Sequence, residues 1–156
     1  MSCEKSERRK ILLATDGSET SKKAAAFAAG LIEGVSDLVI TVITVITVPK
    51  SYYSRRLYWA AKERPSEAEE IKKLFLEEAQ RILQETTGIL SRRGIKTNTV
   101  VREGDPAEEI VKCAQEIGAN HIVMGTRGMG NVMEFFLGSV ARKVVHLSAV
   151  PVSLVK

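Results

Sequence analysis

The chain has 156 residues, of which 44% are hydrophobic and 27% are charged, and these proportions exclude a disordered or fibrous protein. The net charge is +4, and the basic residues are interleaved with glutamates, so no basic stripe indicates nucleic-acid binding. The longest apolar run, 38–48, is shorter than the roughly 17–25 residues that cross a bilayer. With two cysteines and no signal peptide, we expect a single cytoplasmic domain over 1–156 with a polar tail at 1–9, and neither a membrane nor a nucleic-acid partner.

The first third of the chain predicts two strands and a helix. Residues 11–15 (ILLAT) form a short apolar run that leads into the turn sequence DGS, which is typical of a buried strand. Ser18 is expected to cap an alanine-rich helix over 19–33. Residues 38–48 (LVITVITVITV) are almost all β-branched, which favours a strand that is buried on both faces of a sheet.

The segment 49–65 differs from the rest because it holds all three tyrosines, the only tryptophan (Trp59) and the pair Arg55–Arg56. We interpret it either as a surface loop or as a lid, in which Tyr52 or Tyr53 would cover a nucleoside.

The remaining segments continue the alternation of helices and strands. A capping box, Ser66-x-x-Glu69, is expected to begin a helix that ends near residue 94. The other expected elements are strands at 95–102, 121–125 and 150–155, and helices at 105–118 and 137–147, the last with Val140, Val144, Val145 and Leu147 facing inward. This order predicts an α/β fold with one open, five-stranded parallel sheet and helices on both faces. Ligands of such sheets bind at the carboxyl ends of the strands, where the strand order reverses.

Residues 125–139 (GTRGMGNVMEFFLGS) join a strand end to a helix start through several glycines. Glycine lets the backbone approach a ligand closely, and the free N–H groups of a helix start bind anions. Arg127 and Ser139 would add a charged contact and a hydroxyl. The segment therefore predicts a phosphate cradle, and a glycine-rich loop without a ligand is the alternative. It is not a P-loop, because Asn131-Val132 stand where Lys and Ser/Thr belong.

Three stretches together resemble the universal stress protein family: ILLATDGSE, the closing PVSLV, and the pattern G-x2-G-x9-G-S formed by Gly125, Gly128, Gly138 and Ser139. The resemblance extends from about residue 9 to residue 156. The full glycine pattern is similar to that of the ATP-binding members of the family. The resemblance therefore implies a Rossmann-like, adenine nucleotide alpha hydrolase-like fold.

The same resemblance implies ATP as the ligand, with Mg²⁺ or Mn²⁺ carried by its phosphates. Thr15 and Asp16 would lie beside the nucleoside, where Asp16 would bind a ribose hydroxyl or act through a metal, since its charge would repel a triphosphate. The adenine would meet the backbone of the second strand, at Thr44 or Val45. The complete implied set of cofactor-binding residues is Ala14, Thr15, Asp16, Thr44, Val45, Met124, Gly125, Arg127, Gly128, Gly130, Gly138, Ser139 and Val140.

The resemblance implies a regulatory, stress-related nucleotide-binding protein. We expect at most slow ATP hydrolysis, because no general base is identified. We expect a homodimer through the last strand and an unidentified protein partner. A dimeric interaction protein that uses no nucleotide is the main alternative. A receiver-like domain is disfavoured because Arg102-Glu103, and no Asp, follow the third strand, and a flavin carrier because its phosphate loop would follow the first strand. Cys113 and His121 are expected to be structural.

Overall fold

The computed structural model describes residues 9–32, 38–47, 65–128 and 137–156, with the side chains of 65–68 excepted. Three sequence-based predictions therefore lie outside the described residues: most of the polar tail, the possible lid with Tyr52, Tyr53, Arg55, Arg56 and Trp59, and the contact from Gly130.

Strands and helices alternate along the chain as expected. The elements are β1 (Arg9–Ala14), α1 (Glu19–Gly30), β2 (Leu38–Ile46), α4 (Pro65–Ser91), β3 (Thr97–Glu103), α5 (Pro106–Ile117), β4 (His121–Gly125), α6 (Ser139–Leu147) and β5 (Val152–Val155). The five strands form one sheet in the order β3-β2-β1-β4-β5, and every neighbouring pair is parallel. The predicted α/β fold is thus confirmed.

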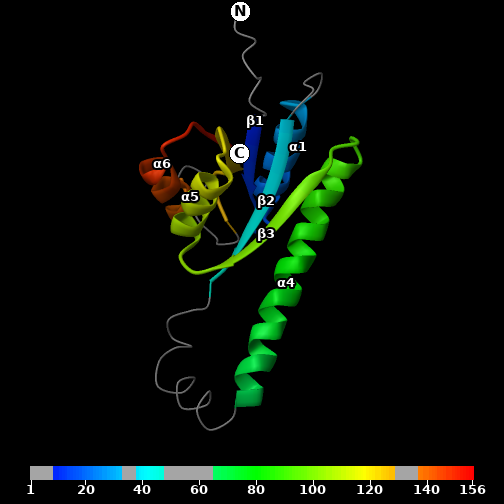
Figure 1. Cartoon of the computed structure of the whole chain (residues 1–156), viewed down its shortest axis with the longest axis vertical. Helices are drawn as coiled ribbons and strands as arrows, with labels where there is room; N and C mark the ends of the chain where they lie inside the picture. The colour runs from blue at the N-terminus through cyan, green and yellow to red at the C-terminus, as the bar shows by residue number, and fades with distance from the viewer. Residues whose placement is uncertain (1–8, 33–37, 48–64, 129–136) are drawn as a thin grey trace, which may run out of the picture.

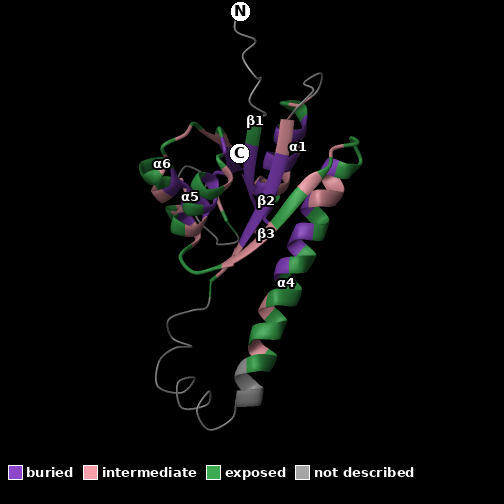
Figure 2. Cartoon of the chain, viewed as in Figure 1, coloured by how far each residue is buried: buried purple, intermediate pink, exposed green. Residues whose placement is uncertain are grey.

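The sheet forms the middle of three layers (Figure 1). Successive strand residues point to opposite faces, so Leu12 joins a hydrophobic cluster with α5 and α6, and Leu13 joins a second cluster with α1 and α4. Strand β2 lies between two strands and is buried from Ile40 to Thr44, which confirms the prediction of a strand covered on both faces (Figure 2).

The helix starts follow local side-chain chemistry. The Ser18 side chain accepts the N–H of Ser21 and caps α1, as expected. Helix α4 begins at Pro65, so Ser66 lies within its first turn and the expectation that Ser66 is the N-cap is wrong. Proline suits the first helical position because its φ is already helical and that position needs no N–H donor.

Helices α6 and α4 are only partly buried. In α6, Val144 is fully buried, but Val145 and Leu147 are 47% and 41% exposed, so their expected inward orientation is wrong. Val140 packs against the core and Val144, four residues later, shares its helix face, whereas Val145 lies about 100° around the helix from Val144 and so turns away from that face. In α4, the first buried residue among the described side chains is Ala79, and the earlier part of the helix extends past the sheet (Figure 2).

Candidate functional site

The strand order reverses between β1 and β4. The chain leaves β1 towards β2 on one side and leaves β4 towards β5 on the other. The segments that follow these two strands therefore diverge at the carboxyl edge of the sheet. A crevice is expected at such a point, and it is where open α/β sheets bind ligands. Asp16 follows β1, and Thr126 to Gly128 follow β4.

Asp16 and Gly128 meet at this point. One carboxylate oxygen of Asp16, Oδ1, accepts the N–H of Ser18 at 3.0 Å, which holds the half-buried side chain in place. A Cβ atom on Gly128 would lie 2.7 Å from the other oxygen, Oδ2. Any residue larger than glycine at 128 would therefore displace the Asp16 carboxylate.

Gly125 and Gly138 permit close helix packing around the end of β4. A Cβ on Gly125 would lie 2.5 Å from Thr20 Oγ1 and 2.9 Å from the backbone nitrogen of Ser21, both in the first turn of α1. A Cβ on Gly138 would lie 3.1 Å from the carbonyl oxygen of Thr126. That same oxygen accepts the N–H of Gly138 at 2.8 Å, which fixes the start of α6 beside the strand end. The glycines at 125 and 138 thus bring the ends of two helices to the crevice.

The start of α6 has the properties of an anion site. Gly138 is its N-cap, no described side chain caps the helix, and the first turn holds no acidic residue. The first N–H groups of a helix have no partner within the helix and carry the positive end of its dipole. Ser139 is exposed at this end, and Arg127 lies half-buried just before Gly128.

Several of the predicted site residues have side chains that are buried away from the crevice, so only their backbone groups could contact a ligand. The Thr15 hydroxyl is buried and hydrogen-bonded to the hydroxyls of Ser21 (3.2 Å) and Thr86 (3.0 Å), between α1 and α4. The side chains of Ala14 and Met124 belong to the buried cluster beneath α5 and α6, and Val140 packs against it. Side-chain contacts from these residues to a ligand are therefore not available.

Backbone directions distinguish Thr44 from Val45. Ile43 directs its carbonyl towards β1, where it accepts the N–H of Thr15 at 2.9 Å, and Ile46 directs its carbonyl towards β3, where it accepts the N–H of Gly104 at 3.1 Å. Because these directions alternate along a strand, Val45 faces the β1 side and Thr44 faces β3. The last β1 residue in register is Ala14, opposite Ile43, so Val45 presents its backbone beyond the end of β1.

Two features escaped the sequence analysis. The hydroxyls of Thr20 and Ser18 donate to the Arg127 carbonyl, at 2.6 and 3.3 Å, and so join α1 to the glycine segment. The Thr126 hydroxyl is buried and has no hydrogen-bond partner among the described residues. The turn sequence DGS indicated a helix cap, but no sequence pattern indicates a contact between residues 107 positions apart.

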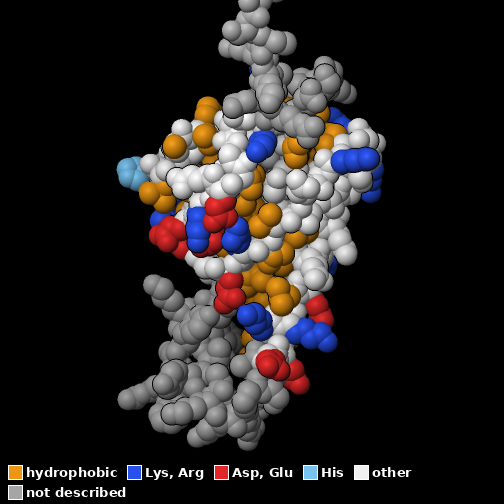
Figure 3. Space-filling view, in the orientation of Figure 1, with side chains coloured by type: hydrophobic (Ala, Val, Ile, Leu, Met, Phe, Trp, Pro, Cys, Tyr) orange, Lys and Arg blue, Asp and Glu red, His pale blue; other side chains and the backbone are white. Residues whose placement is uncertain are grey.

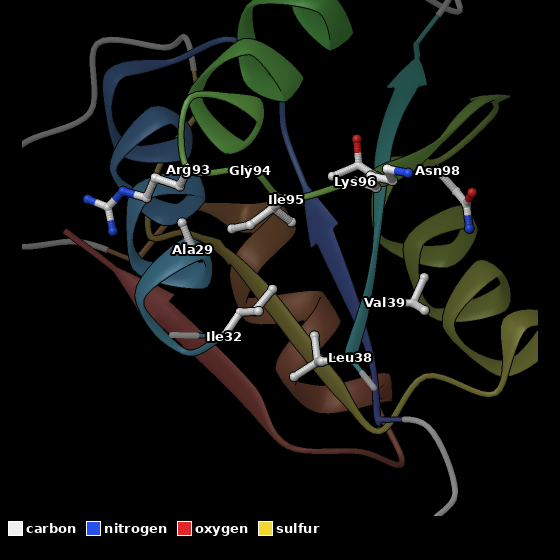
Figure 4. A pocket seen from close by; sticks show the side chains of 10 residues that line it. Ala29, Ile32, Leu38, Val39, Arg93, Gly94, Ile95, Lys96 and Asn98 are labelled. Atoms are coloured by element: carbon white, nitrogen blue, oxygen red, sulfur yellow. The ribbon is translucent and has the colours of Figure 1, made fainter. Parts of the chain in front are cut away.

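A hollow of about 610 Å³ lies at the opposite edge of the sheet (Figure 4). Ile32 follows α1, Leu38 begins β2 and Ile95 precedes β3, and all three line the hollow. This hollow holds none of the glycines that shape the carboxyl edge of the sheet and is not the candidate nucleotide site.

Charges elsewhere serve local structure. Lys143 pairs with Asp105 (3.1 Å) and Glu108 (2.8 Å), and charges of both signs are interspersed on the face shown in Figure 3.

Burial raises the pKa of the Cys113 thiol, which is 1% exposed in the core, as expected of a structural cysteine. His121 bonds Ser153 Oγ at 2.9 Å, far from the carboxyl end of β4. Over the described ranges, no cluster of three or more His, Cys, Asp or Glu side chains could hold a metal ion, and no helix is long and apolar enough to cross a membrane.

Comparison with known proteins identifies the family. The model of the universal stress protein family matches residues 7–156. Universal stress protein MJ0577 of Methanocaldococcus jannaschii is 34% identical over 155 residues, which cover 95% of this chain and 94% of the relative. Universal stress protein YxiE of Bacillus subtilis is 32% identical over 154 residues, with 94% and 98% covered.

Solved structures share the fold. That of MJ0577 matches with a TM-score of 0.79 at 30% identity and covers 96% of both chains. A universal stress protein from Archaeoglobus fulgidus in complex with dAMP matches with a TM-score of 0.67 over 96% of this chain and 99% of its own, and at 22% identity it supports the fold alone. With the family model spanning nearly the whole sequence, the chain belongs to the universal stress protein family.

Proposed function

We propose that this universal stress protein binds ATP at the crevice between β1 and β4 and acts as a nucleotide-dependent regulator of a stress response. The observation that carries the proposal is the approach of Asp16 to Gly128 beside the uncapped start of α6. The Asp16 carboxylate, which can accept hydrogen bonds from sugar hydroxyls, thereby lies beside the backbone N–H groups that can donate to phosphates. The dAMP held by the Archaeoglobus fulgidus protein makes adenine nucleotides the first class to test.

The phosphates would bind the backbone N–H groups of Gly128 and of the first turn of α6, supplemented by the Ser139 hydroxyl and the Arg127 guanidinium. The fit is supported by glycine at 128, because a residue without a Cβ lets a ligand approach its backbone N–H closely. Mg²⁺ or Mn²⁺ would be carried by the phosphates and would offset part of their charge near Asp16.

The nucleoside would lie towards β1 and β2. An ionised carboxylate only accepts hydrogen bonds, so Asp16 suits the ribose hydroxyls. Of the two candidates on β2, we assign the adenine contact to the Val45 backbone, because it is directed to the β1 side beyond the last β1 residue in register.

Hydrolysis would be slow at most. His121 is the first residue of β4, and His146 lies in the last turn of α6, so both lie at the ends of their elements that are remote from the crevice. Asp16, the carboxylate beside Gly128, is assigned to the ribose hydroxyls, so no general base or water-orienting group is assigned at the phosphates.

The proposed assembly is a homodimer through β5. This strand is an edge of the sheet. Pro151 and Val155 direct their carbonyls to β4, where they accept the N–H groups of Ile122 and Thr126. By alternation, Val152 and Leu154 direct their backbone groups outward, where a second copy of β5 would pair with them about a two-fold axis. The expected protein partner and the cytoplasmic location stay predictions from the sequence.

The test combines mass spectrometry of small molecules released from the purified protein with calorimetric titration by ATP, AMP, GTP and adenosine. We expect co-purified adenine nucleotide, and ATP affinity above that for adenosine and GTP. The Asp16→Ala variant should weaken ATP and adenosine alike, since it removes the proposed ribose acceptor. If the folded wild type binds no adenine nucleotide with Mg²⁺ present, the proposal is wrong and the nucleotide-independent dimer is favoured.

A further inference from the structure

Two hydroxyls at the start of α1, from its N-cap Ser18 and from Thr20, converge on one carbonyl group of the glycine segment. Thr20 Oγ1 donates to the carbonyl oxygen of Arg127 at 2.6 Å, and Ser18 Oγ does so at 3.3 Å. Ser18 already caps α1 through the N–H of Ser21, also at 3.3 Å, so its hydroxyl is shared. The shorter bond from Thr20 is therefore the main constraint on this carbonyl.

The direction of the Arg127 carbonyl determines the direction of the Gly128 N–H. In a trans peptide the C=O and the following N–H point in opposite directions. Because Thr20 holds the carbonyl towards α1, the Gly128 N–H points away from α1. If this peptide rotated by half a turn, a carbonyl oxygen would replace the N–H and would repel a phosphate.

A glycine segment needs such a constraint. Glycine has no Cβ to restrict its backbone, so the peptide before Gly128 can rotate more readily than most. Yet glycine is required at 128, because any Cβ would lie 2.7 Å from Asp16 Oδ2. Gly128 thus makes room for the Asp16 carboxylate but restricts the Arg127–Gly128 peptide little. The hydrogen bond from Thr20, which lies outside the segment, supplies the missing restriction.

We propose that Thr20 is a positioning residue for the nucleotide phosphates: its hydroxyl holds the Arg127–Gly128 peptide in the orientation that presents an N–H to them. This inference rests on the proposed nucleotide site. It predicts that the Thr20 hydroxyl affects ligands with phosphates and leaves the binding of adenosine unchanged.

The test compares Thr20→Ala with Thr20→Ser, which differ only by the hydroxyl. Thr87→Ala is the matched control, because Thr87 bonds only a carbonyl of its own helix, that of Gln84 at 3.2 Å. Calorimetry with Mg²⁺ measures ATP and adenosine affinity for variants shown to be folded by circular dichroism. We expect Thr20→Ala to weaken ATP about tenfold, the loss of roughly one charge-assisted hydrogen bond. Thr20→Ser and Thr87→Ala should keep wild-type ATP affinity.

A second readout follows the peptide itself. The carbonyl ¹³C resonance of Arg127 in the nucleotide-free protein should move in Thr20→Ala and stay near its wild-type position in Thr20→Ser. Unchanged ATP affinity in Thr20→Ala, or equal weakening of ATP and adenosine, would overturn the role of Thr20 and leave the nucleotide function intact. Failure of the wild type to bind ATP would overturn both.

Discussion

Asp16 Oδ2 lies where it leaves no room for a side chain on Gly128, since a Cβ there would be only 2.7 Å away. Real Cβ contacts are essentially never this short. The Asp16 carboxylate has limited freedom to retreat, because its other oxygen accepts the Ser18 N–H at 3.0 Å. The residue after β1 and the glycine after β4 are therefore sterically coupled.

Replacing Gly128 with alanine should therefore weaken ATP binding by displacing Asp16 as well as by crowding the phosphates. We expect a loss of roughly tenfold or more in calorimetric affinity, about 1.4 kcal/mol or above. On an Asp16→Ala background the same change should cost less, because the displaced carboxylate is already absent, and the two substitutions should be non-additive.

Gly88→Ala is the control for this experiment. Gly88 lies within α4, and a Cβ there would meet nothing within 4 Å. Alanine at that position should stabilise the helix by up to about 1 kcal/mol and leave ATP affinity unchanged. Strict additivity of Gly128→Ala and Asp16→Ala would contradict the steric coupling.

Thr126→Val tests the buried hydroxyl that has no partner among the described residues. An unsatisfied buried hydroxyl costs about 1–3 kcal/mol, so an isosteric apolar residue should maintain or raise the free energy of unfolding. If the hydroxyl contacts the nucleotide, ATP affinity should fall in the same variant. Urea denaturation and calorimetry measure the two effects separately.

Thr86→Val is the comparison for that variant. The Thr86 hydroxyl donates to the Ile82 carbonyl at 2.9 Å and bonds Thr15 at 3.0 Å, so its loss should lower the free energy of unfolding by about 1 kcal/mol or more. A similar loss in Thr126→Val would show that the Thr126 hydroxyl has a protein partner after all.

The order of the elements was predictable because apolar runs, β-branched residues and turn signals are local properties of the sequence. The bounds of β4, His121–Gly125, were predicted without error, since a short apolar run bounded by polar residues leaves little choice. Burial along the helices was harder to predict. Val145 is apolar like Val144, and only the contacts of α6 with its neighbours show which of them faces the core.

The candidate site was predictable in outline. The glycine pattern located the carboxyl end of β4, and DGS located that of β1. The sequence does not reveal the role of each glycine: Gly125 accommodates α1, whereas Gly128 accommodates Asp16. It also could not choose between Thr44 and Val45, because the repeat ITVITVITV contains no landmark and the choice depends on which neighbour each carbonyl faces.

Asp105 should make the stability of α5 depend on pH. The N–H of Glu108 bonds the Asp105 carboxylate at 3.1 Å and, with Lys143 nearby, holds the pKa of that carboxyl below its ordinary value of 3.8. A lowered folded pKa stabilises the protein above the unfolded pKa, and this contribution is lost as pH falls through the folded value. Asp105→Ala should lower the free energy of unfolding by about 1 kcal/mol at pH 7, which is the usual contribution of an N-cap.

The pH dependence is measured by urea unfolding at neutral pH and at pH values well below 3.8, where the carboxyl of the folded protein becomes protonated. The difference in the free energy of unfolding between the wild type and Asp105→Ala should become smaller in acid. Asp105→Asn should retain most of the cap at pH 7, because asparagine also accepts the N–H, and should show a flatter acid profile. A deficit for Asp105→Ala that is equal at both pH values would show that the ionised form contributes nothing.

Two neighbouring residues of β5 allow dimer assembly and folding to be tested separately, because their N–H groups point to opposite sides of the strand. Val152 directs its N–H away from the sheet, by alternation from Pro151, whose carbonyl accepts the N–H of Ile122 at 2.9 Å. Proline at 152 therefore removes a donor that only a partner strand would use. We expect Val152→Pro to sediment as a folded monomer at concentrations where the wild type is a dimer.

Ser153→Pro is the matched control. It removes an N–H on the β4 side and should instead lower the thermal midpoint. A wild type that is monomeric at micromolar concentration, or a Val152→Pro variant that remains dimeric, would show that the two copies do not pair through β5.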